Sequence, residues 1–202
     1  EDRYPRSRHL ESGHELSDLL RESESTGEAS VLPPVTRHLY STALWHVTTG
    51  KPEDAFLVLE KLLNRAKALG VEDAPLLARA RLLQVRLCLE PLQQADRAAS
   101  ILRAMLEGEA GPHASRAAFL LGEAEKARGR WTEAVEAYRG FIRTHPKDAR
   151  VDRAQLMIGE CFDRAGDSRA ARAAYGLVVA NYPDSIWVPA ARSRMIAIDA
   201  KP

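Results

Sequence analysis

The sequence contains little of what several other classes of protein depend on. It has only two cysteines, Cys88 and Cys161, in 202 residues, which excludes a framework of several disulfides. Each lies among aliphatic residues in an expected helix, which predicts two buried free thiols, with a disulfide or a catalytic thiol as the alternative. The formal net charge of +1 excludes a strongly basic nucleic-acid-binding protein and an acidic disordered chain.

Long apolar runs and the common catalytic motifs are also missing. No apolar run reaches the roughly 18–20 residues that span a membrane, so we expect no membrane span. The six histidines form no His-Glu-x-x-His motif, and the sequence has no Cys-x-x-Cys motif or phosphate-binding loop. Serines stand mainly where a helix cap is expected, without a base and an orienting group beside them. We therefore expect no enzymatic activity, no metal site, no cofactor and no nucleic-acid partner.

Residues that favour β-strands are few. Val, Ile and Thr together number 24 of 202, whereas Ala, Leu, Arg and Glu are abundant, and Arg outnumbers Lys by 23 to 6. This composition favours helix, and no stretch alternates apolar and polar residues with the period of a strand. The sequence therefore predicts an all-α fold.

The second half of the chain repeats itself with a period of 37 residues. Gly129 of the first copy would allow a left-handed turn between a helix over 114–128 and a helix over 132–143, which Thr132 would cap. Tyr138 would fill the space toward the next unit. Such a helical hairpin cannot bury both of its faces alone, so it needs a neighbour to stack against. The coinciding pairs are Gly122 and Gly159, Gly129 and Gly166, Ala134 and Ala171, Tyr138 and Tyr175, and Pro146 and Pro183.

This order of glycine, glycine, alanine, tyrosine and proline resembles the tetratricopeptide repeat. The second copy departs from the family pattern at Ser168, where an aromatic residue is usual, and at Ile158, where leucine is usual. The resemblance implies an α-solenoid, a right-handed superhelix of antiparallel helix pairs. It also implies that the chain binds proteins or peptides rather than catalysing a reaction.

The same pattern, more weakly, extends the array toward the N-terminus. We expect residues 35–202 to form the array, with units at about 36–70, 74–108, 114–148 and 152–185 and a capping helix over 187–199. Residues 1–34 would form an N-terminal helix and a mobile linker. They are a candidate remnant of a preceding repeat, because Tyr4-Pro5-Arg6-Ser7 resembles Tyr182-Pro183-Asp184-Ser185.

In this family, four positions of each first helix commonly face a concave groove. The residues at these positions mix aromatic, aliphatic and charged groups, which suits an extended peptide or a helix of a partner protein. Their alternative role is that of ordinary solvated helix residues. Carried over position by position, the expected partner-binding residues are Arg37, Tyr40 and Leu44 in the first unit, Arg116, Phe119, Glu123 and Lys126 in the third, and Arg153, Leu156, Glu160 and Asp163 in the fourth.

Three functions follow as hypotheses. The first is a non-enzymatic interaction scaffold in a bacterial complex. Its period and its Tyr-Pro-x-Ser segments resemble tetratricopeptide proteins of the Gram-negative envelope, which favours a periplasmic or outer-membrane-associated place over the cytoplasm. The second is a regulatory or sensory domain of a longer signalling or transcription-control protein. The third is an enzyme whose active site this scaffold would assemble.

Overall fold

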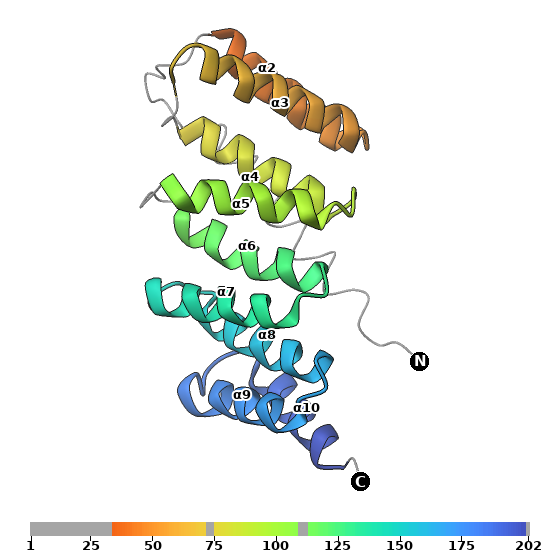
Figure 1. Cartoon of the computed structure of the whole chain (residues 1–202), viewed down its shortest axis with the longest axis vertical. Coiled ribbons are helices and arrows are strands. Elements are labelled where there is room, and N and C mark those ends of the chain that lie inside the picture. Colours follow the sequence, from red (N-terminus) through yellow and green to blue (C-terminus); the bar gives the residue numbers. More distant parts are fainter. Residues whose placement is uncertain (1–33, 72–74, 109–112, 201–202) are drawn as a thin grey trace. The chain divides into compact units, whose positions relative to one another are not determined.

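The structure is a computed structural model that describes residues 34–71, 75–108 and 113–200 (Figure 1). Within these ranges it contains nine helices and no strand, which confirms the predicted all-α fold. The chain divides into two compact units, residues 1–81 and 82–202. The expected N-terminal helix and linker over 1–34 lie almost wholly outside the described residues.

The first unit is built around the hairpin of helices α2 (Pro34–Thr48) and α3 (Pro52–Ala68). Gly50 has a φ of 71°, which a glycine adopts without strain, and this turn reverses the chain. Pro52 stands at the start of α3, where a missing backbone N–H costs nothing. Tyr40 and Ala43 of α2 and the alanines, leucines and Phe56 on the inner side of α3 form the buried seam. The boundary to the second unit lies within helix α4 (Pro75–Leu89).

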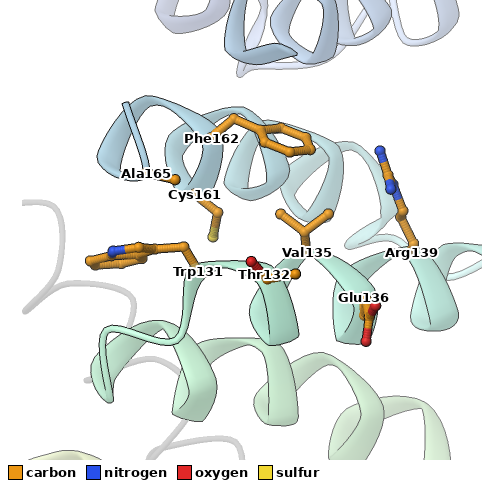
Figure 2. A pocket seen from close by; sticks show the side chains of 8 residues that line it. All are labelled: Trp131, Thr132, Val135, Glu136, Arg139, Cys161, Phe162 and Ala165. Carbon is orange, nitrogen blue, oxygen red and sulfur yellow. The ribbon is translucent and has the colours of Figure 1, made fainter. Parts of the chain in front are cut away.

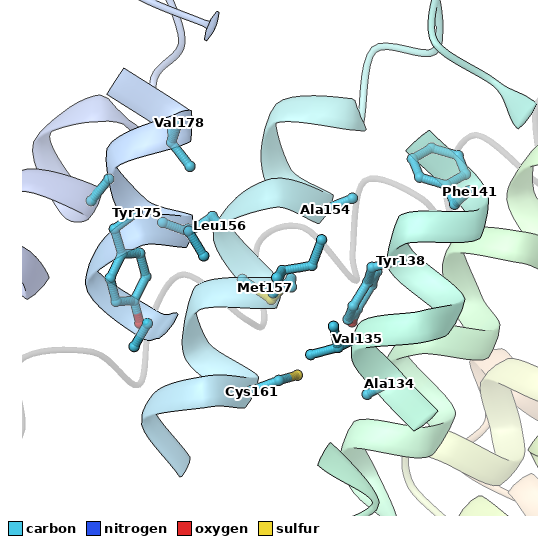
Figure 3. Packing of buried hydrophobic residues seen from close by; sticks show 14 of the residues in the cluster. Ala134, Val135, Tyr138, Phe141, Ala154, Leu156, Met157, Cys161, Tyr175 and Val178 are labelled. Atoms are coloured by element: carbon cyan, nitrogen blue, oxygen red, sulfur yellow. The ribbon is translucent and has the colours of Figure 1, made fainter. Parts of the chain in front are cut away.

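The second unit continues with six further helices, each packed on the next. An ion cluster joins the first two, because the carboxylate of Glu125, only 2% exposed, pairs with Arg103 and Arg128. An apolar cluster of buried residues then extends from Phe119 to Ala191, and Figure 3 shows part of it. The helices are α5 (Ala95–Gly108), α6 (Ala114–Ala127), α7 (Trp131–Thr144), α8 (Val151–Arg164), α9 (Ser168–Asn181) and α10 (Val188–Asp199).

Two glycine–tyrosine pairs set the approach of the helices within the repeats. A Cβ atom added to Gly122 in α6 would lie 2.4 Å from Cε1 of Tyr138 in α7, and one added to Gly159 in α8 would lie 2.5 Å from Cε1 of Tyr175 in α9. No real Cβ approaches a ring so closely. Each tyrosine therefore lies directly over the glycine of its own hairpin, and Tyr138 also lies between α7 and α8 (Figure 3). Both tyrosines are fully buried.

The local helix signals are confirmed in part. Gly129 and Gly166 have φ values of 72° and 84°, as the turn prediction requires. Thr132 is not the cap of α7, because the helix begins at Trp131 and the carbonyl of Arg130 already accepts the N–H of Ala134 at 2.9 Å. At the corresponding place before α9, the carboxylate of Asp167 does cap the helix by accepting the N–H of Ala170.

Two further features concern the second unit of the predicted array and the thiols. Within residues 74–108, helix α5 begins at Ala95, because Gln93 has a φ of 54° and cannot continue a right-handed helix. Cys88 and Cys161 are buried and free, as predicted. Burial raises the pKa of the Cys161 thiol to about 11, so this thiol stays protonated and unreactive at neutral pH.

Candidate functional site

The predicted partner-binding residues fall into two groups by burial. Tyr40, Phe119 and Leu156 are only 3–4% exposed, so they belong to the core and supply almost no contact area. Glu123, Lys126, Arg153 and Glu160 keep between 21% and 31% of their side chains exposed. The surface over α6 and α8 is thus charged, with the aromatic and aliphatic groups beneath it.

Two ion pairs connect α6 to α8 across this surface. The carboxylate of Glu123 lies 3.8 Å from a guanidinium nitrogen of Arg153, and the ammonium of Lys126 lies 3.5 Å from the carboxylate of Glu160. Both distances exceed those of a close charge-assisted hydrogen bond. Partly exposed pairs of this kind contribute roughly 0–1 kcal/mol, so charged groups of a ligand can replace either partner at little cost.

The Arg153 guanidinium is held in place by aromatic rings. It lies 5.4 Å from the ring centre of Phe119 and 5.9 Å from that of Trp187, which are cation–π distances. The buried Phe119 ring therefore supports this guanidinium from within the core. Trp187 stands outside the repeat positions used for the prediction, although a lone tryptophan after a repeat is a signal for a contact role.

Tyr138 orients the acidic partner of Arg153. Its phenol donates a hydrogen bond to Oε1 of Glu123 at 3.2 Å. Burial, with the negative charge of Glu123, raises the pKa of Tyr138 well above its usual value, so the phenol remains a donor. The buried tyrosine of the repeat core thereby fixes a carboxylate on the surface.

The other predicted residues surround these pairs or lie in the first unit. Arg116 and Asp163 are half-buried on α6 and α8. Arg37 is exposed and Leu44 half-buried on α2. The structure therefore brings together residues of the third and fourth units, whereas Arg37 and Leu44 lie on α2 of the first compact unit.

A small cleft lies elsewhere in the second unit, between α7 and α8 (Figure 2). Val135, Phe162 and the sulfur of Cys161 line its apolar part. Arg139 also lines the cleft, and its guanidinium lies 5.6 Å from the centre of the Phe162 ring. Among the described residues no group of three or more His, Cys, Asp or Glu side chains could hold a metal ion. None of the described helices combines the length and the apolar character needed to cross a membrane.

Comparison with known proteins identifies the repeats. Models of the tetratricopeptide repeat match residues 92–149 and 153–185, which include both glycine–tyrosine hairpins. The chain therefore contains tetratricopeptide repeats at these residues. The match over residues 92–149 also includes α5, although this helix has few of the glycine, alanine and tyrosine residues that mark the two clear repeats. No curated protein sequence shows significant similarity to the chain.

Solved structures with the same fold cover most of this chain. The nearly identical TPR-like repeats assigned to a kinesin light chain of Podospora anserina share 17% identity, covering 83% of this chain and 87% of that one, with a TM-score of 0.65. MamA of Desulfovibrio magneticus RS-1, from its residue 41 onward, shares 19% identity over 89% and 92%, with a TM-score of 0.58. A thermophilic TPR protein of Thermus thermophilus shares 17% over 81% and 80%, with a TM-score of 0.52. At these identities the likeness concerns the fold.

Proposed function

We propose that the chain is a non-enzymatic scaffold whose charged surface over α6 and α8 binds an extended peptide or a helix of a partner protein. Tetratricopeptide repeats are in general non-catalytic modules that bind proteins. The binding residues would be the groups that remain partly exposed: Arg116, Glu123, Lys126, Arg153, Glu160 and Asp163.

The observation that carries the proposal is the position of Arg153. Phe119 and Trp187 hold its guanidinium, while its ion pair with Glu123 is loose at 3.8 Å. A guanidinium fixed in this way loses little side-chain entropy when a carboxylate of a partner replaces Glu123. In the same way, a charged group of the partner could replace Lys126 or Glu160 in the second ion pair, one helical turn further along α6 and two turns along α8.

We further propose that this scaffold works in a bacterial complex of the cell envelope. The support is limited to the sequence: the 37-residue period, the Tyr-Pro-x-Ser segment at 182–185 and a composition rich in Arg and Ala. Detection of the native protein in periplasmic and outer-membrane fractions is the direct test. Recovery in the cytoplasmic fraction alone would contradict this part of the proposal.

Charge exchange within the first ion pair tests the binding surface. The double variant with Glu123→Arg and Arg153→Glu keeps an ion pair between α6 and α8 but inverts its direction. We expect the helical content to stay close to that of the unchanged chain and the unfolding temperature to fall, because the Tyr138 phenol loses its carboxylate acceptor. Partner proteins captured by the unchanged chain from the native host should no longer be retained at a temperature where both chains are folded. The measurement is affinity capture followed by quantitative mass spectrometry.

The control is Arg169→Glu, which reverses an exposed charge on α9. This variant should retain the same partners as the unchanged chain. Retention of those partners by the inverted double variant would place the binding surface elsewhere. Phe119→Ala is unsuitable for this purpose, because the ring is buried and its loss would destabilise the core.

A further inference from the structure

Helix α10 occupies the place of a first helix in a further repeat. Shifting the sequence by 37 residues aligns Ala117 of α6 with Ala154 of α8 and Ala191 of α10, and all three are at most 1% exposed. Val151 and Val188, the first residues of α8 and α10, also coincide. The 37-residue shift therefore assigns to each residue of α8 an equivalent residue on the same side of α10.

One side of α8 is covered by α9. There the side chain of Gln155 donates to the carbonyl oxygen of Ala174 at 3.1 Å, and Gly159 lies under the ring of Tyr175. The corresponding residues of α10 are Arg192 and Ile196. Both are exposed, Ile196 to 70%, and no described helix covers them.

Where α8 has Gly159, which leaves space for a ring, α10 has Ile196, whose side chain projects from the helix. At Gly159, a Cβ alone would lie 2.5 Å from the tyrosine ring, so Ile196 cannot accept a tyrosine at the facing position. A helix that lies on α10 as α9 lies on α8 must instead present a small residue, into whose space the Ile196 side chain can project.

The charge of the same side is positive. Asp199, the only acidic residue of α10, is already bound by Arg172 of α9 through two contacts of 2.6 and 3.0 Å. Arg192 is exposed on this side, whereas Arg194, two residues further, lies about 200° around the helix and acts on Tyr175 of α9. A complementary helix would therefore carry a carboxylate near Arg192, which replaces the hydrogen-bond donor Gln155 of the preceding repeat.

We propose that the Arg192 and Ile196 side of α10 binds an amphipathic helix of a partner protein that presents a small residue to Ile196 and, one turn further along, a carboxylate to Arg192. This site is separate from the surface over α6 and α8 and does not depend on the function proposed there.

Two labelled peptides with the sequence of residues 167–183 provide the probes. Both carry Val178→Glu, which places a carboxylate about one turn after Tyr175, the residue that faces Gly159 in α8. One of them also carries Tyr175→Ala, which provides the small residue for Ile196. Titrated with the full chain and followed by fluorescence anisotropy, the peptide with alanine should bind, and the peptide with tyrosine should bind about tenfold more weakly because of overpacking. Ile196→Gly in the chain should reverse this preference, and Arg192→Glu should weaken binding of both peptides.

Ile186→Gly is the matched control, because it removes the same side chain from a residue that is 80% exposed but outside α10. Binding of both peptides should be unchanged in this variant. Equal binding of the two peptides, no binding of the alanine peptide, or no reversal with Ile196→Gly would overturn the proposal. A chain that sediments as a dimer and becomes monomeric with Ile196→Gly would assign this side to a second copy, and would equally overturn it.

Discussion

Two helical glycines, Gly122 and Gly140, differ in how closely neighbouring side chains pack against them. Gly122 lies beneath the Tyr138 ring, whereas a Cβ at Gly140 in α7 would have no atom within 4 Å apart from its adjoining residues and the backbone of its own helix. Neither position requires a left-handed backbone. The contacts of the added methyl group, rather than helix propensity, should therefore decide the sign of a glycine-to-alanine substitution at each place.

We expect Gly122→Ala to lower the free energy of unfolding by roughly 1–3 kcal/mol, because the buried ring cannot move aside in a packed core. The matched substitution Gly140→Ala should raise it by roughly 0.5–1 kcal/mol, because alanine loses less backbone entropy in a helix. Urea unfolding followed by circular dichroism measures both. Equal effects of the two variants would contradict the close packing of Tyr138 over Gly122.

Each of the two clear repeats closes with a serine–aspartate hydrogen bond between its first helix and the turn that ends it. In the third unit, Ser115 near the start of α6 donates to Asp148, which Arg150 also binds. In the fourth unit, Ser185 in the turn donates to Asp152 near the start of α8 at 2.5 Å. A shift of 37 residues pairs Ser115 with Asp152 and Asp148 with Ser185. The two residue types have therefore exchanged places while the hydrogen bond remained.

Exchange of the two residues in the fourth unit should be tolerated better than either single change. Asp152→Ser leaves two hydroxyls facing each other, and Ser185→Asp places two carboxylates together, so each should destabilise the chain. The double variant with both substitutions should recover stability, with a coupling energy of roughly 0.5–3 kcal/mol in a double-mutant cycle. Additive effects of the single changes would show that the pair contributes no common interaction.

The arrangement of helices in the two clear repeats was predictable from local sequence signals. Glycines at Gly129 and Gly166, the alanines and tyrosines of each second helix, and the 37-residue period suffice to predict two stacked hairpins. The cap of α7 was not predictable from Thr132 alone, because the preceding turn brings Arg130 into the first helical hydrogen bond.

The candidate site was predictable only as a set of positions. The family pattern names Phe119 and Arg153 as equivalents of groove residues, but it does not show that the guanidinium covers the ring. That contact, like the pairs of Glu123 with Arg153 and Lys126 with Glu160, depends on how α8 packs beside α6. Interactions between consecutive repeats are set by their mutual packing angle, which no single repeat encodes.

At the scale of the whole molecule, the buried apolar cluster from Phe119 to Ala191 lies entirely within the second unit. Stability of a repeat array is approximately a sum of repeat and neighbour terms. We therefore expect a fragment of residues 75–202, which keeps α4 whole, to retain its helical content and to unfold cooperatively. Circular dichroism and the dispersion of its NMR spectrum measure this, and a poorly dispersed spectrum would contradict it.

The serine–aspartate bond also bears on how such arrays change in length. Both of its members belong to one 37-residue block, Ser115 with Asp148 and Asp152 with Ser185. A duplicated or deleted block would carry donor and acceptor together, so neither would be left without its counterpart. Duplication or deletion of a whole block can therefore lengthen or shorten this protein without breaking the bond that closes each block.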